Sequence, residues 1–151
     1  MKKQLLIGHF LTLLTGGFIY ILFRPDTLKM FGWFDKLNFT ESLEQIRNIT
    51  LPYLDHLPNW FLYSLPDGLW LFSYISLLLA IWGNEITKQN ILWLFLIPII
   101  AIFSEIGQFI SIVPGTFDMM DMAFYVSGVV LPILLFSRPL KTGNLYFLHK
   151  K

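Results

Sequence analysis

The sequence contains no cysteine and few charged residues. Without cysteine it can form no disulfide, no thiolate nucleophile and no thiolate-bound metal site. Charged side chains make up 14% of the 151 residues, and the net charge is +1 with no long basic run. A nucleic-acid interface needs a patch of lysine and arginine that displaces counterions from the phosphates. Nucleic-acid binding is therefore excluded.

Apolar and aromatic residues, by contrast, are in excess. They make up 55% of the chain, with fifteen phenylalanines and five tryptophans, and the mean hydropathy is +0.60. Soluble domains contain about 45–50% apolar and about 25% charged residues. The composition is instead typical of helices that face lipid chains, with aromatic rings at the head-group level. We therefore expect residues 1–151 to form a single membrane domain, with membrane lipid as its first partner.

Four apolar stretches predict four transmembrane helices. The first, residues 5–23, follows two lysines as the apolar part of a signal peptide would, but Arg24-Pro25-Asp26 follows it instead of a cleavage site of small residues. A stretch of roughly 19 residues can cross a hydrocarbon core of about 30 Å, so we expect a retained helix. The expected fold class is all-α, an integral membrane bundle. Its other helices are expected at residues 65–82, 91–112 and 118–136.

Residues 24–64 are predicted to form an aromatic loop that prolines interrupt, between the first two transmembrane helices. Within this loop Asn38 is expected to cap a short helix that has Glu41 at its third position. Such a helix is expected to lie on the membrane surface. Its apolar side is formed by Leu43, Ile46 and Ile49.

Local signals also mark the ends of the second transmembrane helix. Ser64 is expected to cap it, with Pro66 in its first turn and Asp67 returning the cap hydrogen bond. Gly83 and Asn84 are expected to end it. A polar turn, residues 83–90, should then lead to the third helix.

The positions of the basic residues predict the orientation in the membrane. The N-terminus, the 83–90 turn and the C-terminus together carry seven basic residues against Glu85 alone, whereas the opposite side carries four basic and eight acidic residues. Because lysine and arginine are enriched in cytoplasmic loops, both termini are expected in the cytoplasm and the 24–64 loop outside. The seven basic residues are Lys2, Lys3, Lys88, Arg138, Lys141, Lys150 and Lys151.

One carboxylate, Glu105, lies well inside the third predicted helix. An ionisable group at this depth costs a few kcal/mol, so its presence requires a partner or a function. Gln108 lies three residues further on and projects from the same face, where its amide could orient Glu105 or share a ligand with it. The structural alternative is that both residues form hydrogen bonds between helices.

Aspartates at the ends of neighbouring helices are expected to join Glu105. Asp118 and Asp121 begin the fourth helix, and Tyr125 continues their stripe. Helices joined by a short turn lie antiparallel and adjacent, and Asp67 begins the second helix at the same outer end. Such a cluster suits a shared proton, a hard cation, or a proton donor and acceptor. Alternatively, the aspartates only cap their helices.

These considerations select candidates for ligand binding but no catalytic residue, metal site or cofactor. His9 is expected to pack in the first helix and His56 to lie on the surface, and neither has a second ligand at metal spacing. The candidates are Asp67, Glu105, Gln108, Asp118, Asp121 and Tyr125.

The run Glu105-Ile-Gly-Gln108, followed by Pro114-Gly115-Thr116-Phe117-Asp118-Met-Met-Asp121 and then Gly128, resembles the VanZ-like family of small bacterial membrane proteins. Its signature reads Glu-x-x-Gln, a Pro-Gly-Arg turn, an Asp or Ser, and Asp-x-x-x-Asn-x-x-Gly. The resemblance covers about residues 65–135, and Asp67 matches an acidic residue of the family. The turn arginine is absent, Tyr125 replaces the asparagine, and the Lys and His that often follow the family's first Asp are Gly68 and Leu71. Arg24 or Arg47 would have to replace the turn arginine.

The resemblance implies an envelope function in the bacterial inner membrane. A named member of the family is associated with low-level resistance to the glycopeptide teicoplanin. Our first hypothesis is therefore a protein that binds, or binds and acts on, a lipid-linked or cell-wall-related ligand. The second is a non-catalytic subunit whose aromatic loop docks a larger membrane or surface complex. A third is a hydrolase assisted by Mg²⁺ or Ca²⁺.

Overall fold

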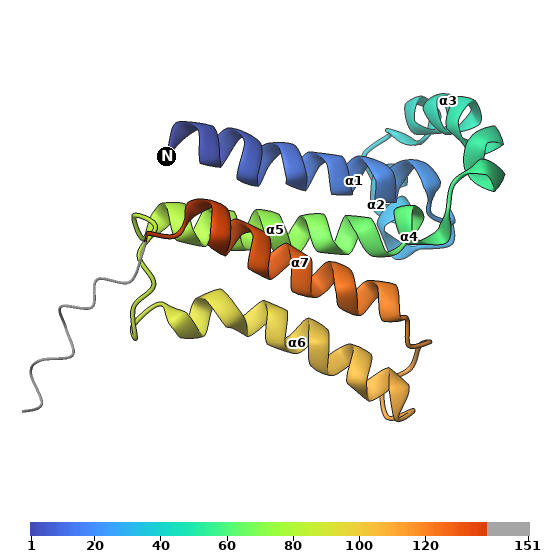
Figure 1. The fold of residues 1–151 in the computed structure, drawn as a ribbon. Helices are drawn as coiled ribbons and strands as arrows, with labels where there is room; N and C mark the ends of the chain where they lie inside the picture. Colours follow the sequence, from blue (N-terminus) through green and yellow to red (C-terminus); the bar gives the residue numbers. More distant parts are fainter. Residues whose placement is uncertain (139–151) are drawn as a thin grey trace, which may run out of the picture.

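The computed structural model describes residues 1–138. Every regular element in this part is a helix, and four helical segments are long and apolar enough to cross a membrane (Figure 1). The expected all-α membrane bundle is therefore confirmed, whereas the predicted cytoplasmic residues Lys141, Lys150 and Lys151 lie outside the described part. The four segments are Gln4–Phe23, α5 (Ser64–Ile81), α6 (Ile91–Phe109) and α7 (Met119–Phe136).

The first transmembrane segment consists of a π-helical stretch, η1 (Gln4–Leu11), that continues into α1 (Thr12–Phe23). It is joined to α5 by polar contacts, since Gln4 Nε2 donates to the carbonyl of Ser76 at 3.0 Å and His9 Nδ1 lies 2.7 Å from Ser73 Oγ. In lipid, such hydrogen bonds hold helices together where the hydrophobic effect contributes little. His9 therefore packs between helices, in agreement with the role expected for it.

Helix α5 lies between α1 and α7 and makes most of the contacts in the bundle (Figure 1). Its backbone approaches that of α7 closely at Gly68 and Gly128. A Cβ atom on Gly68 would lie 2.9 Å from the carbonyl oxygen of Phe124, and one on Gly128 would clash with the carbonyl oxygen of Gly68. Small residues permit this approach between membrane helices. The buried core beside it contains Leu71, Ile75, Leu79, Leu94 and Val129.

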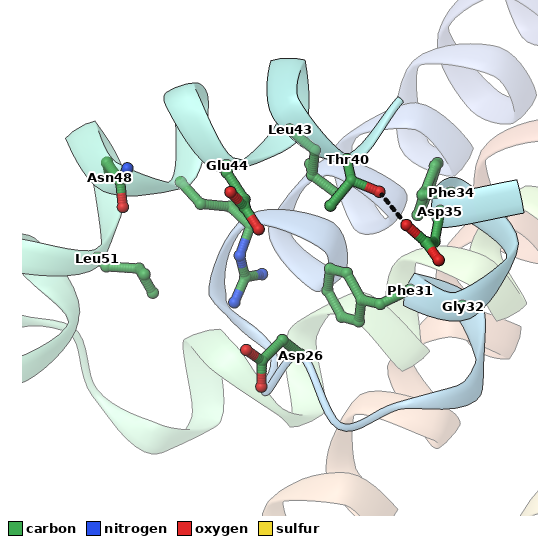
Figure 2. A pocket seen from close by; sticks show the side chains of 11 residues that line it. Asp26, Phe31, Gly32, Phe34, Asp35, Thr40, Leu43, Glu44, Asn48 and Leu51 are labelled. Carbon is green, nitrogen blue, oxygen red and sulfur yellow. Dashed lines mark hydrogen bonds between the residues drawn. The ribbon is translucent and has the colours of Figure 1, made fainter. Parts of the chain in front are cut away.

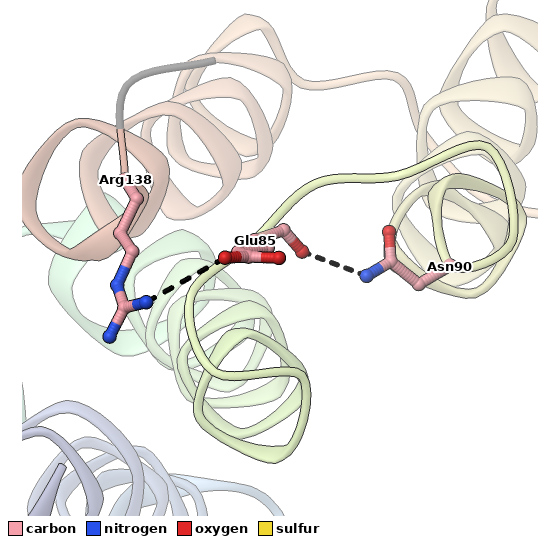
Figure 3. Close-up of polar contacts among 3 residues, drawn as sticks. All are labelled: Glu85, Asn90 and Arg138. Atoms are coloured by element: carbon pink, nitrogen blue, oxygen red, sulfur yellow. Dashed lines mark hydrogen bonds and ion pairs between the residues drawn. The ribbon is translucent and has the colours of Figure 1, made fainter. Parts of the chain in front are cut away.

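Polar contacts tie the 83–90 turn to the end of α7 (Figure 3). Arg138 forms an exposed ion pair with Glu85 at 3.6 Å, and Asn90 Nδ2 donates to the carbonyl of Glu85 at 2.8 Å. Gln4 also donates to Asn84 Oδ1 at 2.7 Å. The N-terminus, this turn and the end of α7 therefore share one end of the bundle, as the topology of four spans requires.

The connection between α1 and α5 contains several short helices, and its predicted cap is wrong. Asn38 does not cap α3, because it has a left-handed φ of +58° and ends α2, while Phe39 precedes α3 without a side-chain cap. Asparagine tolerates this conformation at helix C-termini. The helices are α2 (Lys29–Lys36), α3 (Thr40–Thr50), η2 (Leu51–His56) and α4 (Asn59–Leu62).

The start of α5 also differs from the prediction. Ser64 makes no capping hydrogen bond, and its buried hydroxyl has no partner within the described protein. The reason is that α4 leads directly into α5: the intervening Tyr63 has φ −113° and ψ −50°, and its N–H donates to Asn59 at 2.9 Å. The chain therefore enters α5 from a helical turn and not from an extended cap residue.

The expected end of α5 is confirmed, but α6 ends earlier than residue 112. Gly83 has φ +62°, and the N–H of Asn84 donates to the carbonyl of Leu79 at 2.6 Å, which is a Schellman motif. The same motif ends α6 at Phe109, because Ser111 has φ +59° and the N–H of Ile112 donates to Gly107 at 2.8 Å.

Candidate functional site

Acidic side chains from three helices gather at the end of the bundle opposite the N-terminus. Asp67 lies in the first turn of α5, Glu105 near the end of α6 and Asp121 in the first turn of α7. Their carboxylates lie close enough for the charges to interact, and the hydroxyl of Tyr125 donates to Asp67. The structure therefore brings together the residues that helix spacing and the short α6–α7 turn had placed at one end.

Glu105 is almost fully buried, with 3% of its surface exposed. Its Oε2 accepts a hydrogen bond of 3.3 Å from the backbone N–H of Asp118, so it joins the end of α6 to the start of α7. Within residues 1–138, no hydrogen bond joins Gln108 to Glu105. Glu105 thus forms an interhelical hydrogen bond, but with the backbone of α7.

Gln108 instead supports the turn between α6 and α7. Its amide lies against Gly115, where a Cβ atom would come within 2.8 Å of the side-chain Cδ of Gln108. Gly115 has φ +138°, a conformation that residues with a side chain rarely adopt. The glycine and the amide therefore fit together and fix the shape of this corner.

The two aspartates of α7 differ in their surroundings. Asp118 is exposed and caps α7, since its Oδ1 accepts from the N–H of Met120 at 2.8 Å. Asp118 therefore caps its helix, which was the alternative to a role in ligand binding. Asp121 is half-buried, and its Oδ1 is inaccessible with no hydrogen-bond partner within the described protein. Leaving such an atom unsatisfied costs about 1–3 kcal/mol, more when it is charged, so Asp121 has capacity for a donor.

Asp67 faces a phenol and lies near a guanidinium. The hydroxyl of Tyr125 donates to Asp67 Oδ2 at 3.4 Å, and the charge of Arg24 also acts on this carboxylate. Arg24 is held by aromatic rings, with its Cζ 4.9 Å from the ring centre of Tyr20 and 4.5 Å from that of Tyr63. A cation that directly follows α1 thus stands at the acidic end of the bundle.

A groove of about 240 Å³ runs beside the cluster, between α5, α6 and α7. Sequence reasoning missed it, although Trp70 and Tyr74 lie on the same face of α5 as Asp67 at helical spacing. The hydroxyl of Tyr74 also donates to the carbonyl of Trp93 in α6. The groove is lined by Asp67, Trp70, Leu71, Tyr74, Ile97, Ala101 and Tyr125.

A second cavity of about 440 Å³ lies between α2 and α3, where Asp26, Phe31 and Glu44 face a common space (Figure 2). Arg47 lines it but is only 8% exposed, and its guanidinium is already hydrogen-bonded. Its two terminal nitrogens donate to the carbonyls of Ile21 at 2.5 Å and Arg24 at 2.9 Å. Arg47 therefore anchors the loop to the end of α1 and does not replace the turn arginine of the VanZ-like pattern.

Fold and site together define a small helical membrane protein with an acidic cluster at one end of its bundle. Among residues 1–138, no group of three His, Cys, Asp or Glu side chains is placed to hold a metal ion. In comparisons with known proteins, no family model, no curated protein and no solved structure matches the chain.

Proposed function

We propose that this chain is a VanZ-like envelope protein of the bacterial inner membrane that binds a lipid-linked or cell-wall-related ligand through its acidic cluster. The observation that carries the proposal is the convergence of Asp67, Glu105 and Asp121 from three transmembrane helices. Ionisable groups within transmembrane helices are rare and are characteristic of functional sites in membrane proteins, and Glu105 is the buried one of the three.

The contacts within the motif divide its residues into two roles. Glu105 and Gln108 build the corner between α6 and α7, through the Asp118 backbone and Gly115. Asp67, Asp121 and Tyr125 are held around this corner with acceptor capacity left on the aspartates. The residues on which the family resemblance rests thus lie at one corner of the bundle, and Asp121 is the member with a buried carboxylate oxygen that has no partner within the described protein.

Isosteric removal of the Asp121 charge is expected to abolish the envelope phenotype. A deletion strain would be complemented with wild type, Asp121→Asn, Glu105→Gln or Glu85→Gln, and tolerance to teicoplanin and other envelope-targeting antibiotics measured. Glu85 is the matched control because it is an exposed carboxylate at the opposite end of the bundle. Wild type and Glu85→Gln should restore tolerance, whereas the other two should not. Full tolerance from Asp121→Asn at wild-type abundance would contradict the proposal.

The orientation included in the proposal can be measured by thiol labelling. Because the chain contains no cysteine, each introduced cysteine is its only thiol. A membrane-impermeant maleimide applied to intact spheroplasts should label a Lys36→Cys variant, in the outer loop, but not a Lys88→Cys variant. Both should react after lysis. Labelling of the Lys88→Cys variant alone would invert the orientation and place the acidic cluster in the cytoplasm.

A second candidate function is a non-catalytic subunit that docks a larger complex through the loop between α1 and α5. It is favoured by large apolar side chains that this loop exposes, among them Trp33 (65% exposed) and Ile49 (70% exposed). Trp60 stacks on Phe124 of α7, so Trp33 is the sharper probe. Purification in mild detergent should yield a stoichiometric partner that Trp33→Ala loses; purification without a partner would count against this function.

A further inference from the structure

The groove beside the acidic cluster lies within the membrane-spanning part of the bundle. It extends along α5 from Asp67 to Tyr74, which is about 10 Å at a helical rise of 1.5 Å per residue. It is open on one side, because α6 packs less closely on α5 than α7 does. The side chain facing it at Ala101, in the middle of α6, is a single methyl group. Figure 1 shows α6 set apart from the α1–α5–α7 layer.

The environment of this groove determines what can fill it. Its walls are mainly apolar, with Trp70, Leu71 and Ile97 lining it. At this depth the surrounding solvent is hydrocarbon, which forms no hydrogen bonds with the protein. A lipid chain entering from the side covers these walls without desolvating a polar surface.

The polar end of the groove determines the head group. Asp67 and Tyr125 line it there, and the hydroxyl of Tyr125 donates to Asp67 Oδ2 at 3.4 Å, so Asp67 is the carboxylate that a ligand in the groove meets. An ionised carboxylate only accepts hydrogen bonds, whereas an ammonium group carries three donors and the complementary charge. Arg24, whose guanidinium packs on Tyr20 and Tyr63 at this end of the bundle, carries the charge that complements a phosphate.

We propose that the groove between α5 and α6 binds one chain of an aminophospholipid whose ammonium group donates to Asp67. This inference rests on the proposed function, since it specifies the lipid-linked ligand of the same cluster. It assigns separate tasks to the two parts of the site. The groove holds the hydrocarbon chain, and the carboxylate of Asp67 selects the head group.

Filling the groove tests the chain-binding part. The full-length protein would be reconstituted in vesicles with equal amounts of phosphatidylethanolamine, phosphatidylglycerol and phosphatidylcholine, then extracted in mild detergent, and the retained lipids measured by mass spectrometry. Wild type should retain phosphatidylethanolamine. Ala101→Phe should lower the retained amount about tenfold, the equivalent of roughly 1.4 kcal/mol. Ile100→Phe is the matched control, because Ile100 is one residue away, is 57% exposed and does not line the groove. Ala101→Leu, a smaller change, replaces Ala101→Phe if the latter does not accumulate.

Removing the charge of Asp67 tests the head-group part. Asp67→Asn should retain lipid but lower the ratio of phosphatidylethanolamine to phosphatidylglycerol about tenfold, as expected for the loss of one charge-assisted hydrogen bond. Equal retention of all three lipids by wild type would overturn the proposal. So would unchanged retention in the groove-filling variant, and retention of phosphatidylcholine equal to that of phosphatidylethanolamine would overturn the assignment to a primary amine.

The lipid measurement and the tolerance assay test the lipid assignment and the proposed function separately. If these substitutions leave lipid retention unchanged while Asp121→Asn still abolishes tolerance, the lipid assignment is wrong and the proposed function stands. If retention changes as expected while Asp121→Asn preserves tolerance, the lipid site stands and the envelope role is wrong.

Discussion

Substitution of Gly128 by leucine is expected to disrupt the α5–α7 pair on which the site is built. A Cβ atom at this position would fall on the carbonyl of Gly68 and lie 3.1 Å from the Cβ of Leu71. Neither atom belongs to the flexible end of a side chain, so the helices must separate. Overpacking of this kind costs about 1–3 kcal/mol, occasionally more, and we expect the upper part of that range. Unfolding of the purified protein in detergent, followed by circular dichroism, measures the loss.

Gly17 provides the matched control for this prediction. It also lies within a transmembrane segment, but nothing lies within 4 Å of the position that its Cβ would take. Gly17→Leu should therefore leave stability unchanged or raise it by up to about 1 kcal/mol, because glycine is a poor helix former. Under the proposed function, the Gly128→Leu variant should in addition fail to restore antibiotic tolerance to the deletion strain, since Tyr125 and Asp67 are on the separated helices. Equal stability of both variants would show that α5 and α7 do not meet as closely as described.

The four spans could be predicted because the bilayer imposes both their length and their composition. A segment that crosses it needs about 20 apolar residues and must satisfy its backbone hydrogen bonds internally. The predicted boundaries at residues 5–23 and 65–82 differ from Gln4–Phe23 and Ser64–Ile81 by one residue. The end of α6 was missed by three residues, because Ser111 adopts a left-handed conformation that its residue type does not signal.

Helix caps were predicted less well than transmembrane spans, since a cap depends on the segment that precedes it. Ser64 has the residue type of a cap, but α4 delivers the chain to α5 already in a helical turn. Asn38 has the residue type of both a cap and a helix terminator, and it ends α2. Gly83 and Asn84 were unambiguous, because a glycine after a long apolar helix satisfies the Schellman geometry without strain.

The candidate site was predictable as a gathering of residues but not as a set of contacts. Helix spacing and the short turn suffice to bring Asp67, Glu105 and Asp121 to one end. Which atoms pair depends on distances between helices: Glu105 bonds to the backbone of Asp118, and Gln108 packs on Gly115. The groove was also beyond prediction, because it exists only through the separation of α6 from α5.

Substitution of Arg47 by alanine is expected to release the loop between α1 and α5 from the membrane bundle. Its guanidinium donates to the carbonyls of Ile21 and Arg24 at the end of α1, and its Cζ lies 4.7 Å from the ring centre of Phe31. Hydrogen bonds to a charged group contribute about 1.5–3 kcal/mol each, and the last carbonyls of α1 would lose these partners. We expect a loss of about 3 kcal/mol and rapid proteolysis within residues 24–63, measured by limited digestion in detergent.

Arg47→Lys distinguishes the fork geometry from the charge alone. Lysine keeps the charge but cannot present two rigid donors to two carbonyls, so it should recover less than half of the loss. Arg138→Ala is the control for removing an arginine, since its ion pair with Glu85 is exposed on both sides at 3.6 Å. Such pairs contribute at most about 1 kcal/mol. If Arg47→Ala and Arg138→Ala were digested equally slowly, Arg47 would not anchor the loop to α1.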